Sequence, residues 1–443
     1  MNKKLLKNVV NISFPAIGET ILYNIIAMFD IMLVGRYAGR QAIGAAGLSN
    51  EILLTFSNIF IYLGLAIAVT SLVARAIGSN NYALAEEYAS ISFTIGFIIS
   101  FLIGYIFYKY TKEILIFAGA KGDVLSLGIE FMRICSIGIF FSMISSIFSS
   151  ILRGYGDTST PFLLASIVIL INLTLDIGLI FGKFGLPSLG IIGAALAKTI
   201  AQFIGLIFMA YYMLFKCKIK LKIKYMFLIN FKKLKDLIYF SIPCSLEEGA
   251  ICISRLLSNF MIMHCSTTAY AANQIANTVE SISIMPAVGL GVAATSLIGL
   301  EAGKNSKRTA RSYTKICLQL GVTIMLICAA FFLIMPEILI KLFIKSSETE
   351  VISLSSTCLR IGALEQPFLA ISLIATGAIK GSGNAKTPLI ISVFASWCIR
   401  LPLIFYFIYI LRLSVIHVWW ITTLQWFFDA VATYMFVRKK FMT

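Results

Sequence analysis

Three polar side chains lie inside strongly apolar stretches, and two of them have the types and spacing needed to bind a small cation or a proton. Asp30 lies in an apolar run, residues 25–34, that contains no basic residue. Asn172 and Asp176 occur in a second apolar run and are four residues apart, so they share one face of a helix. Carboxylate and amide oxygens suit a small, hard cation, and a carboxylate also accepts a proton. We therefore predict that the Asn172–Asp176 pair binds a small, hard cation or a proton, and that Asp30 is a separate functional candidate.

The composition places these residues in a membrane protein. Hydrophobic residues make up 59% of the chain, charged residues make up 13%, and the mean hydropathy is +0.91. A soluble domain is roughly 45–50% apolar and about 25% charged. Apolar stretches close to the roughly 20 residues that cross a bilayer as a helix recur along the chain, and no alternating pattern of the β-barrel type is present. The predicted fold class is therefore an all-α polytopic membrane protein.

We predict about twelve transmembrane helices in two pseudo-symmetric six-helix lobes. The spans are expected near residues 12–34, 50–74, 88–108, 126–151, 161–182, 189–215, 238–263, 279–300, 313–335, 354–379, 388–411 and 413–437. The expected domains are an N-lobe (1–215), a basic cytoplasmic linker (216–236) and a C-lobe (237–443).

Basic residues gather in segments that fall on one side of the membrane when the number of spans is even. These residues are Lys3, Lys4 and Lys7; Lys216, Lys218, Lys220, Lys222, Lys224, Lys232, Lys233 and Lys235; Lys304, Lys307, Arg308, Arg311 and Lys315; and Arg438, Lys439 and Lys440. The positive-inside rule makes this side cytoplasmic, so both termini are expected in the cytoplasm and the chain in the plasma (inner) membrane. This topology and anionic lipid headgroups account for the net charge of +17, so no nucleic-acid partner is expected.

The chain contains an internal repeat at about half its length. The motif RGYGDTSTP at residues 153–161 recurs as KGSGNAKTP at residues 380–388, an offset of 227 (380 − 153). Further matches pair Ser13, Pro15, Glu19, Gly64 and Thr70 with Ser241, Pro243, Glu247, Gly289 and Thr295. Two halves with the same order and the same orientation are parallel repeats, which are common in secondary transporters. Shared residues, including the two glycine-rich loops, are predicted to be scaffold, and residues unique to one half are better candidates for chemistry.

The repeat separates the candidate residues of the first half from the scaffold. Asn172 and Asp176 correspond to Ile399 and Leu403 (172 + 227 and 176 + 227), so this pair is not shared. An ionisable residue inside a membrane span is costly and is by default a functional candidate. Two structural alternatives stay open: Asp30 could lie near a helix end and reach water, and the Asn172–Asp176 pair could be a polar clamp between helices.

The second half supplies further candidates for substrate or ion binding. They are Glu247, Glu280, Glu365 and Arg255. Glu365 is the sharpest candidate because its repeat partner is Gly138 (365 − 227). Arg255 could instead neutralise one of these acids as a buried pair, which would make that acid structural. Glu247 matches Glu19 in the first half, which favours a structural role for both.

Several short patterns, taken in order along the chain, resemble the multidrug and toxic compound extrusion (MATE) family. They are Pro15 with Asp30 in the first span, LRGYGD at residues 152–157 with Pro161 after the fourth, Asn172-x-x-x-Asp176 in the fifth, and the Gly/Ala run from Gly190 to Thr199 in the sixth. Each pattern alone is weak, but the ordered set is specific and the likeness covers essentially the whole chain. The resemblance implies a V-shaped pair of lobes around a central cavity, and export of organic cations and amphipathic drugs in exchange for H⁺ or Na⁺.

The resemblance also implies site residues. It assigns an N-lobe ion and proton site to Asp30, Asn172, Asp176 and Thr199. In the resulting hypothesis, protonation of Asp30 redirects its hydrogen bonds, the first helix bends at Pro15 and the drug is expelled. Lys198, beside Thr199, departs from the family pattern: an ammonium group inside the site would compete with Na⁺ and favour H⁺. Neighbours on a helix point about 100° apart, so Lys198 could instead face elsewhere.

Other classes of function fit the sequence less well. The nearest alternative is a lipid-linked precursor flippase of the same broader superfamily, which tends to have extra helices and an arginine-rich cavity; here Arg255 and Arg400 are the main mid-span arginines. A sensor without transport activity would need a signalling domain, and none is recognised. No nucleophile–base pair, P-loop or CxxC pair occurs, so we expect neither an enzyme nor a cofactor. The expected state is a monomer whose partners are drugs, the coupling ion and membrane lipids.

Overall fold

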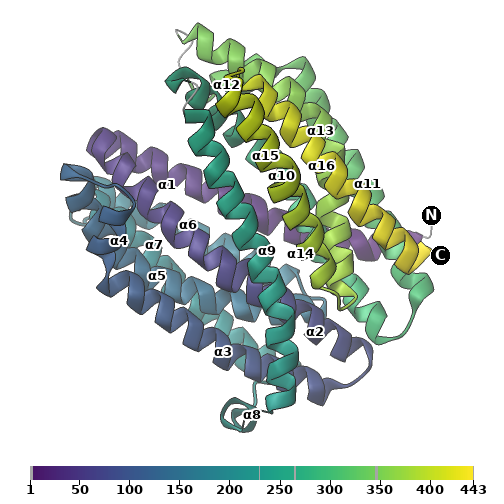
Figure 1. Cartoon of the computed structure of the whole chain (residues 1–443). Helices are drawn as coiled ribbons and strands as arrows, with labels where there is room; N and C mark the ends of the chain where they lie inside the picture. Colours follow the sequence, from purple (N-terminus) through teal and green to yellow (C-terminus); the bar gives the residue numbers. More distant parts are fainter. Residues whose placement is uncertain (1–2, 229, 264–265, 345–347, 443) are drawn as a thin grey trace. The chain divides into compact units, whose positions relative to one another are not determined.

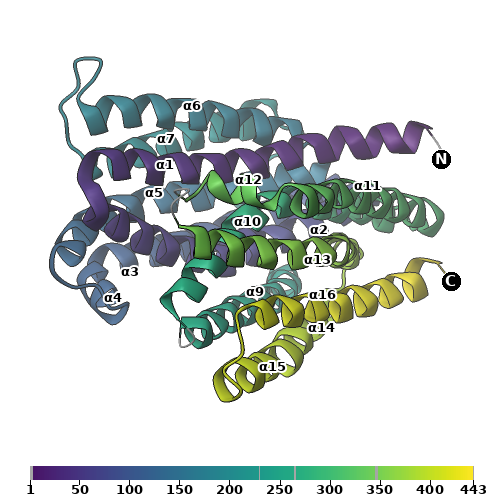
Figure 2. The same ribbon diagram turned by 90° about the horizontal axis from the view of Figure 1, so that it is seen from above.

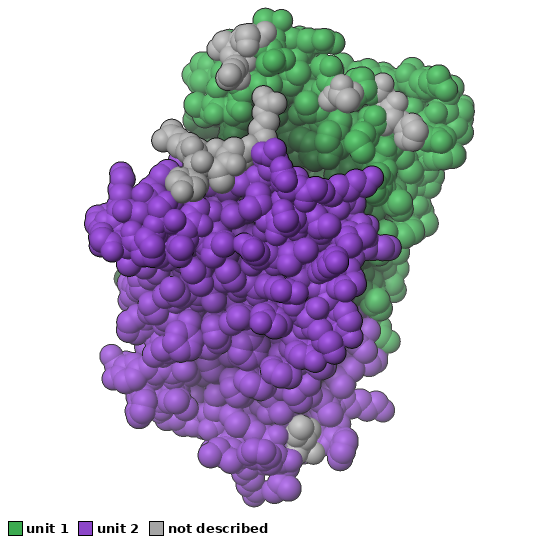
Figure 3. Space-filling model, turned by 90° about the vertical axis from the view of Figure 1, so that its left-hand side faces the viewer, with its two compact units in different colours: residues 1–20, 246–443 green, residues 21–245 purple. Residues whose placement is uncertain are grey.

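The structure is a computed structural model that describes residues 3–228, 230–263, 266–344 and 348–442. Within these ranges every secondary-structure element is helical (Figures 1 and 2). The chain divides into two compact units, which Figure 3 colours separately. Unit 1 comprises Met1–Thr20 and Leu246–Thr443, and unit 2 comprises Ile21–Ser245. The lobe and linker boundaries expected from the sequence stay a prediction.

Eleven helical segments of the described chain are long and apolar enough to cross a membrane. A further helix, α16 (Ile416–Val437), has 22 residues. At 1.5 Å per residue it is about 33 Å long, which also suffices to cross a bilayer core. Its lower hydropathy follows from polar residues such as Gln425 and Asp429. The predicted all-α membrane fold with about twelve spans is thus confirmed.

Unit 2 is built around α5 (Gly122–Tyr155), which packs against α2, α3 and α7. Its other elements are the later part of α1 (Lys3–Ser57), the π-helical segment η1 (Asn58–Leu65), α2 (Ala66–Gly78), α3 (Tyr82–Lys109), α4 (Thr111–Phe117), α6 (Ser159–Phe181), α7 (Ile191–Tyr211), η2 (Tyr212–Lys216), α8 (Ile223–Phe227) and the start of α9 (Phe231–Met263). Figure 2 shows the chain of α1 turning back on itself, so that α1 supplies the first span and begins the second.

Unit 1 is built around α13 (Thr349–Gly381), which packs against α10, α11 and α16. Its other elements are the start of α1, most of α9, α10 (Thr267–Gly303), α11 (Lys307–Ile334), α12 (Pro336–Lys341), α14 (Lys386–Val393), η3 (Phe394–Arg400), α15 (Leu401–Ile404), η4 (Phe405–Ile410), α16 and η5 (Arg438–Met442). The central helices α5 and α13 end in the two matching glycine-rich loops, so they occupy equivalent positions in the two halves of the repeat.

Matched hydrogen bonds show that the repeat is structural. The Thr70 hydroxyl donates to the Ser150 carbonyl at 3.0 Å in unit 2. In unit 1 the repeat-related Thr295 hydroxyl donates to the Gly377 carbonyl, also at 3.0 Å. Each bond ties the second helix of a half to the central helix, so these threonines are scaffold, as predicted from their presence in both halves.

The two glycine-rich loops also have matching architecture. Asp157 accepts hydrogen bonds from the Thr160 amide and hydroxyl at 3.0 and 2.7 Å. Asn384 accepts from the Thr387 amide at 3.1 Å and its own amide group donates to the Thr387 hydroxyl at 2.8 Å. The glycine before each of these residues has a positive φ, 94° and 92°, which a side chain would disfavour. The loops therefore turn the chain and start the next helix.

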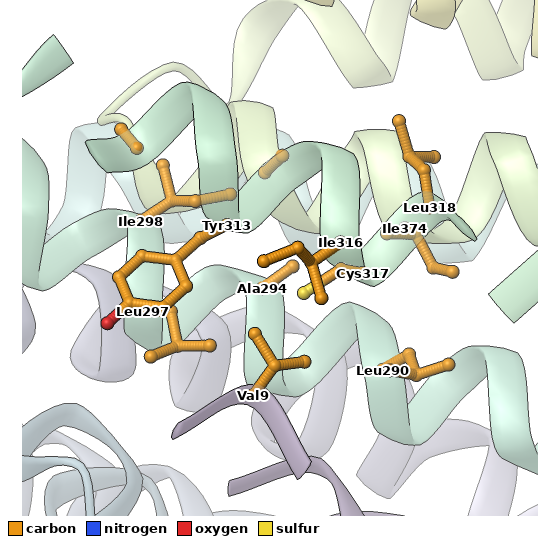
Figure 4. Packing of buried hydrophobic residues seen from close by; sticks show 12 residues of the cluster. Val9, Leu290, Ala294, Leu297, Ile298, Tyr313, Ile316, Cys317, Leu318 and Ile374 are labelled. Atoms are coloured by element: carbon orange, nitrogen blue, oxygen red, sulfur yellow. The ribbon is translucent and has the colours of Figure 1, made fainter. Parts of the chain in front are cut away.

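The first turns of α1 belong to the core of unit 1. Val9 is fully buried in a cluster formed with residues of α10, α11 and α13, among them Tyr313 (Figure 4). The Asn8 amide group donates to the Tyr313 hydroxyl at 3.0 Å. The helix continues into unit 2 after Thr20, and Pro15 lies inside it just before this change.

The helix α9 has the reverse arrangement. Its residues up to Ser245 belong to unit 2 and the rest to unit 1, and Pro243 lies inside it just before the change. Proline removes a backbone donor and weakens the helix locally, so bending there costs little. Each of these two helices therefore has a proline beside the boundary between the units.

Candidate functional site

Unit 2 brings the three polar residues predicted from the sequence into one buried cluster. α1 supplies Asp30, and α6 supplies Asn172 and Asp176. The Asn172 amide nitrogen donates to Asp30 Oδ1 at 3.1 Å and to Asp176 Oδ2 at 2.6 Å. The side chains are 9%, 4% and 1% exposed, respectively, so Asp30 does not reach water from a helix end. The carboxyl groups of Asp30 and Asp176 also lie close enough to interact with each other.

One oxygen of this cluster has no hydrogen-bond partner in the described protein. Asp176 Oδ1 is buried and receives no donor from any described side chain or backbone group. A buried polar atom without a partner normally costs about 1–3 kcal/mol. A proton or a small cation at this oxygen would remove that cost, so the donor set fits either.

Lys198 of α7 lies beside the cluster without joining it directly. Its ammonium group donates to Asn50 Oδ1 at 2.9 Å. The positive charge is close enough to attract both Asp30 and Asp176, but no ion pair within 4 Å links it to either one among the described residues. The lysine therefore faces the site, which is one of the two orientations that the sequence left open.

Thr199 is placed differently from the other three residues that the resemblance implied. Its hydroxyl donates to the Ile134 carbonyl of α5 at 3.1 Å. A Cβ added at Gly138 would lie 2.8 Å from this hydroxyl, so α5 and α7 approach closely here. The described hydrogen bonds of Thr199 thus tie α7 to α5, and none goes to Asp30, Asn172 or Asp176. The repeat partner of Glu365 is glycine because Thr199 occupies that space.

Unit 1 brings Glu280 and Glu365 together in a second buried cluster. Their carboxyl groups lie close enough to interact with each other, and the side chains are 8% and 1% exposed. The Gln366 amide group donates to Glu280 Oε1 at 3.4 Å and accepts from the Ser283 hydroxyl at 2.9 Å. The Thr423 hydroxyl of α16 lies 3.4 Å from Glu365 Oε2. α10, α13 and α16 together build this cluster.

The arginine beside these acids is Arg400. Its charge attracts both Glu280 and Glu365, and its Nε is buried without a hydrogen-bond partner among the described residues. Arg255, which the sequence offered as the neutralising residue, is exposed, and its guanidinium contacts the Cys252 sulfur at 3.4 Å. The structure therefore places Arg255 outside the Glu280–Glu365 cluster.

Glu247 lies apart from that cluster, in a buried ion pair. Its Oε2 is 2.9 Å from the Lys380 ammonium nitrogen, and the two side chains are 7% and 8% exposed. The pair joins α9 to α13, and both members have equivalents in the first half, Glu19 and Arg153. This placement favours the structural role that the sequence left open for Glu247. Glu19 is also buried, at 5% exposure.

The sequence reasoning missed the buried acid Asp429 of α16. It is 1% exposed and accepts hydrogen bonds from the Ser372 and Ser392 hydroxyls at 2.5 and 3.3 Å. The positive charge of Lys380 also attracts it. The sequence could have identified Asp429, because it is a lone carboxylate in the last predicted span, which is the criterion that identified Asp30.

Comparison with known proteins agrees with this architecture. The MatE family model matches the chain at residues 15–177 and 243–406. The two matches begin at Pro15 and Pro243, which are equivalent positions of the repeat. A probable multidrug resistance protein NorM of Thermotoga maritima is 28% identical over 93% of this chain and 88% of that protein. A probable multidrug resistance protein YoeA of Bacillus subtilis is 26% identical over 91% of this chain and 87% of that protein.

Solved structures share the fold. An outward-facing multidrug resistance MATE transporter superposes with a TM-score of 0.91 at 20% identity, over 99% of this chain and 96% of that chain. MATE structures described as bent and straight both give TM-scores of 0.89, with 20% and 21% identity, over 99% of this chain. The superpositions cover 97% of the bent chain and 96% of the straight chain. With both halves matched by the family model, this chain belongs to the MatE family of membrane transporters.

Proposed function

We propose that this protein is a secondary active exporter of organic cations and amphipathic drugs, driven by inward movement of H⁺ through the Asp30–Asn172–Asp176 cluster. The observation that carries the proposal is the shared Asn172 amide nitrogen, which donates to both carboxyl groups in a buried site. The names of the relatives, multidrug resistance proteins, support the substrate class. We further propose a monomer in the plasma membrane with cytoplasmic termini.

The chemistry of the two carboxyl groups supports a proton as the coupling ion. A carboxylate only accepts hydrogen bonds, so Asp30 and Asp176 can bond to each other only while one of them carries a proton. Loss of that proton would leave two negative charges side by side and would break the bond. Binding and release of one proton therefore changes the contact between α1 and α6.

Lys198 supports the choice of H⁺ over Na⁺. A fixed positive charge near both carboxyl groups compensates part of their negative charge and repels a second cation. A proton forms a covalent O–H bond at a single oxygen, whereas Na⁺ needs several oxygens held around it beside the Lys198 charge. Na⁺ at Asp30, Asn172 and Asp176 is the alternative, and its coordination would have to overcome the repulsion from Lys198.

Pro15 links this step to movement. It lies in α1 between the part held in unit 1 and the part that carries Asp30. A change in the Asp30 hydrogen bonds would shift the second part of the helix, and the proline is where the helix bends most easily. The bent and straight structures reported for a MATE protein of the same fold support such a movement.

For the drug we propose the Glu280–Glu365 cluster of unit 1 as the cation-recognising group. Two acids lie near one arginine, Arg400, so the cluster keeps either a negative charge or a proton that a cation could replace. Buried acids inside membrane spans usually pair with each other or mark a substrate path, and this pair does the first in the described structure.

Transport in proteoliposomes tests the proposal. Proteoliposomes that contain the purified protein and are loaded with a fluorescent organic cation should release the cation when a pH gradient, acidic outside, is imposed. An equal Na⁺ gradient should have little effect. Release driven only by the Na⁺ gradient would show that the coupling ion is Na⁺ and not H⁺. No gradient-driven release of any cation tested would reject it in favour of a lipid-linked precursor flippase, which would be tested next.

A further inference from the structure

The linker between α7 and α9 has a regular arrangement of basic and apolar side chains. Lysines at every second position from Lys216 to Lys224 are exposed, while Cys217 and Ile219 between them are buried, at 5% and 0% exposure. In an extended chain successive side chains point to opposite faces. Only residues 217–222 lie outside the helical segments η2 and α8, and this alternation agrees with the exposure of Lys218, Lys220 and Lys222 there. Of the five lysines, Lys216, Lys218 and Lys224 have ammonium groups that make no hydrogen bond or ion pair among the described residues.

The linker is held in place by α3. Lys222 makes a 2.6 Å ion pair with Glu86, and its backbone amide donates to the Ser90 hydroxyl at 3.0 Å. The backbone amide of Lys220 donates to the same Glu86 at 3.3 Å. These contacts hold the linker against α3.

Large apolar side chains follow the lysines and are left uncovered. Ile223 and Phe227 of the short helix α8 are 71% and 83% exposed, and Leu228 and Phe231 are 70% and 82% exposed. The linker joins two membrane spans, Ile191–Lys216 and Phe231–Met263, so it lies at the membrane surface (Figure 1). Basic residues next to exposed aromatic and aliphatic ones are typical of segments that lie in the interface of an anionic bilayer.

We propose that this linker is a binding site for anionic phospholipids, in which Lys216, Lys218 and Lys224 bind headgroup phosphates. The side chains of Ile223, Phe227, Leu228 and Phe231 enter the acyl-chain boundary. The charge selects anionic over zwitterionic lipids, because each basic residue near an anionic surface strengthens binding roughly fivefold. The exposed apolar residues select a lipid over free phosphate, which offers them no contact. This site is separate from the proposed transport sites, and its test does not depend on transport.

Thermal unfolding of the purified full chain in detergent tests the proposal. Dioleoylphosphatidylglycerol should raise the unfolding midpoint, whereas dioleoylphosphatidylcholine and inorganic phosphate should not. The variant Lys216→Gln/Lys218→Gln/Lys224→Gln removes lysines that make no described ion pair. This variant should need on the order of 100-fold more phosphatidylglycerol for the same rise in the unfolding midpoint, because each of the three lysines contributes a factor of about five.

Matched variants separate this site from general charge effects. Lys307→Gln/Arg308→Gln/Arg311→Gln removes the same charge from exposed positions of another basic segment and should change the lipid requirement less than twofold. Phe227→Ser/Phe231→Ser should also weaken the effect, whereas Phe117→Ser, at a position 96% exposed in unit 2, should not. Equal changes in the two triple variants, or equal protection by inorganic phosphate, would overturn the proposal.

Discussion

The amide nitrogen of Asn172 lies 3.1 Å from Oδ1 of Asp30, so one buried hydrogen bond joins α6 to α1 across 142 residues of sequence. Asp176, one turn after Asn172, shares the same nitrogen. Because a carboxylate and a carboxylic acid form different hydrogen bonds, the proposed mechanism predicts that the protonation state of this cluster determines how the two helices contact each other.

Asp30→Asn should abolish gradient-driven efflux and leave the protein folded. The amide preserves the shape of the side chain but binds no proton, so the contact between α1 and α6 no longer changes with proton binding. Efflux from proteoliposomes and the thermal unfolding midpoint measure the two properties. Asp123→Asn, an exposed acid of the same unit, is the control and should transport normally. Retained pH-driven efflux in the Asp30 variant would contradict the assignment.

Lys198→Met should make the transporter sensitive to Na⁺. The substitution keeps a long apolar side chain and removes the charge that repels a second cation from Asp30 and Asp176. We expect a Na⁺ gradient to drive efflux, or Na⁺ to inhibit pH-driven efflux at least tenfold more strongly than in the unchanged protein. Lys183→Met, at an exposed loop position, should behave like the unchanged protein. If Na⁺ changes the efflux of neither variant, Lys198 does not select the coupling ion.

Glu365→Gln should weaken the binding of permanently charged organic cations by about tenfold or more. A hydrogen bond or contact to a charged group contributes about 1.5–3 kcal/mol, and 1.4 kcal/mol corresponds to a factor of ten. Fluorescence titration gives the Kd, with Glu337→Gln, an exposed acid of unit 1, as the control. Unchanged affinity for every cation tested would remove Glu365 from the substrate site.

Glu247→Gln should lower stability and leave drug affinity unchanged. It leaves the Lys380 ammonium group buried without its carboxylate, and the loss of one partner of a buried pair costs about 3–5 kcal/mol. The double variant Glu247→Gln/Lys380→Gln should regain part of this stability, because the Lys380 charge is no longer buried without Glu247, although Asp429 loses the attraction of Lys380. Denaturant titration in micelles measures both. A drop in drug affinity at normal stability would instead place Glu247 in the substrate site.

Sequence patterns were sufficient for the fold and for part of the site. Hydrophobic runs and the 227-residue repeat predicted the spans, because a bilayer imposes length and apolarity on every helix that crosses it. The four-residue spacing predicted that Asn172 and Asp176 share a face. Their contact with Asp30 was suggested by the family resemblance, since no local rule determines which distant helix lies opposite.

Long-range packing accounts for what the sequence did not predict. The choice between Arg255 and Arg400 as the partner of the buried glutamates depends on how α9 and η3 are rotated, and both residues lie in apolar spans. Thr199 is bonded to Ile134 because Gly138 lets α5 and α7 come close. Such contacts follow from helix packing, which a single sequence does not reveal.

Proton movement measured together with drug movement tests the central claim most directly. Proteoliposomes are loaded with a permanently charged organic cation and a pH-sensitive dye, with no pH gradient imposed. The account predicts that the lumen acidifies as the drug leaves, and that neither event occurs with Asp176→Asn in place of the unchanged protein. Drug release without acidification, or acidification that persists in the Asp176 variant, would contradict proton exchange at the Asp30–Asn172–Asp176 cluster.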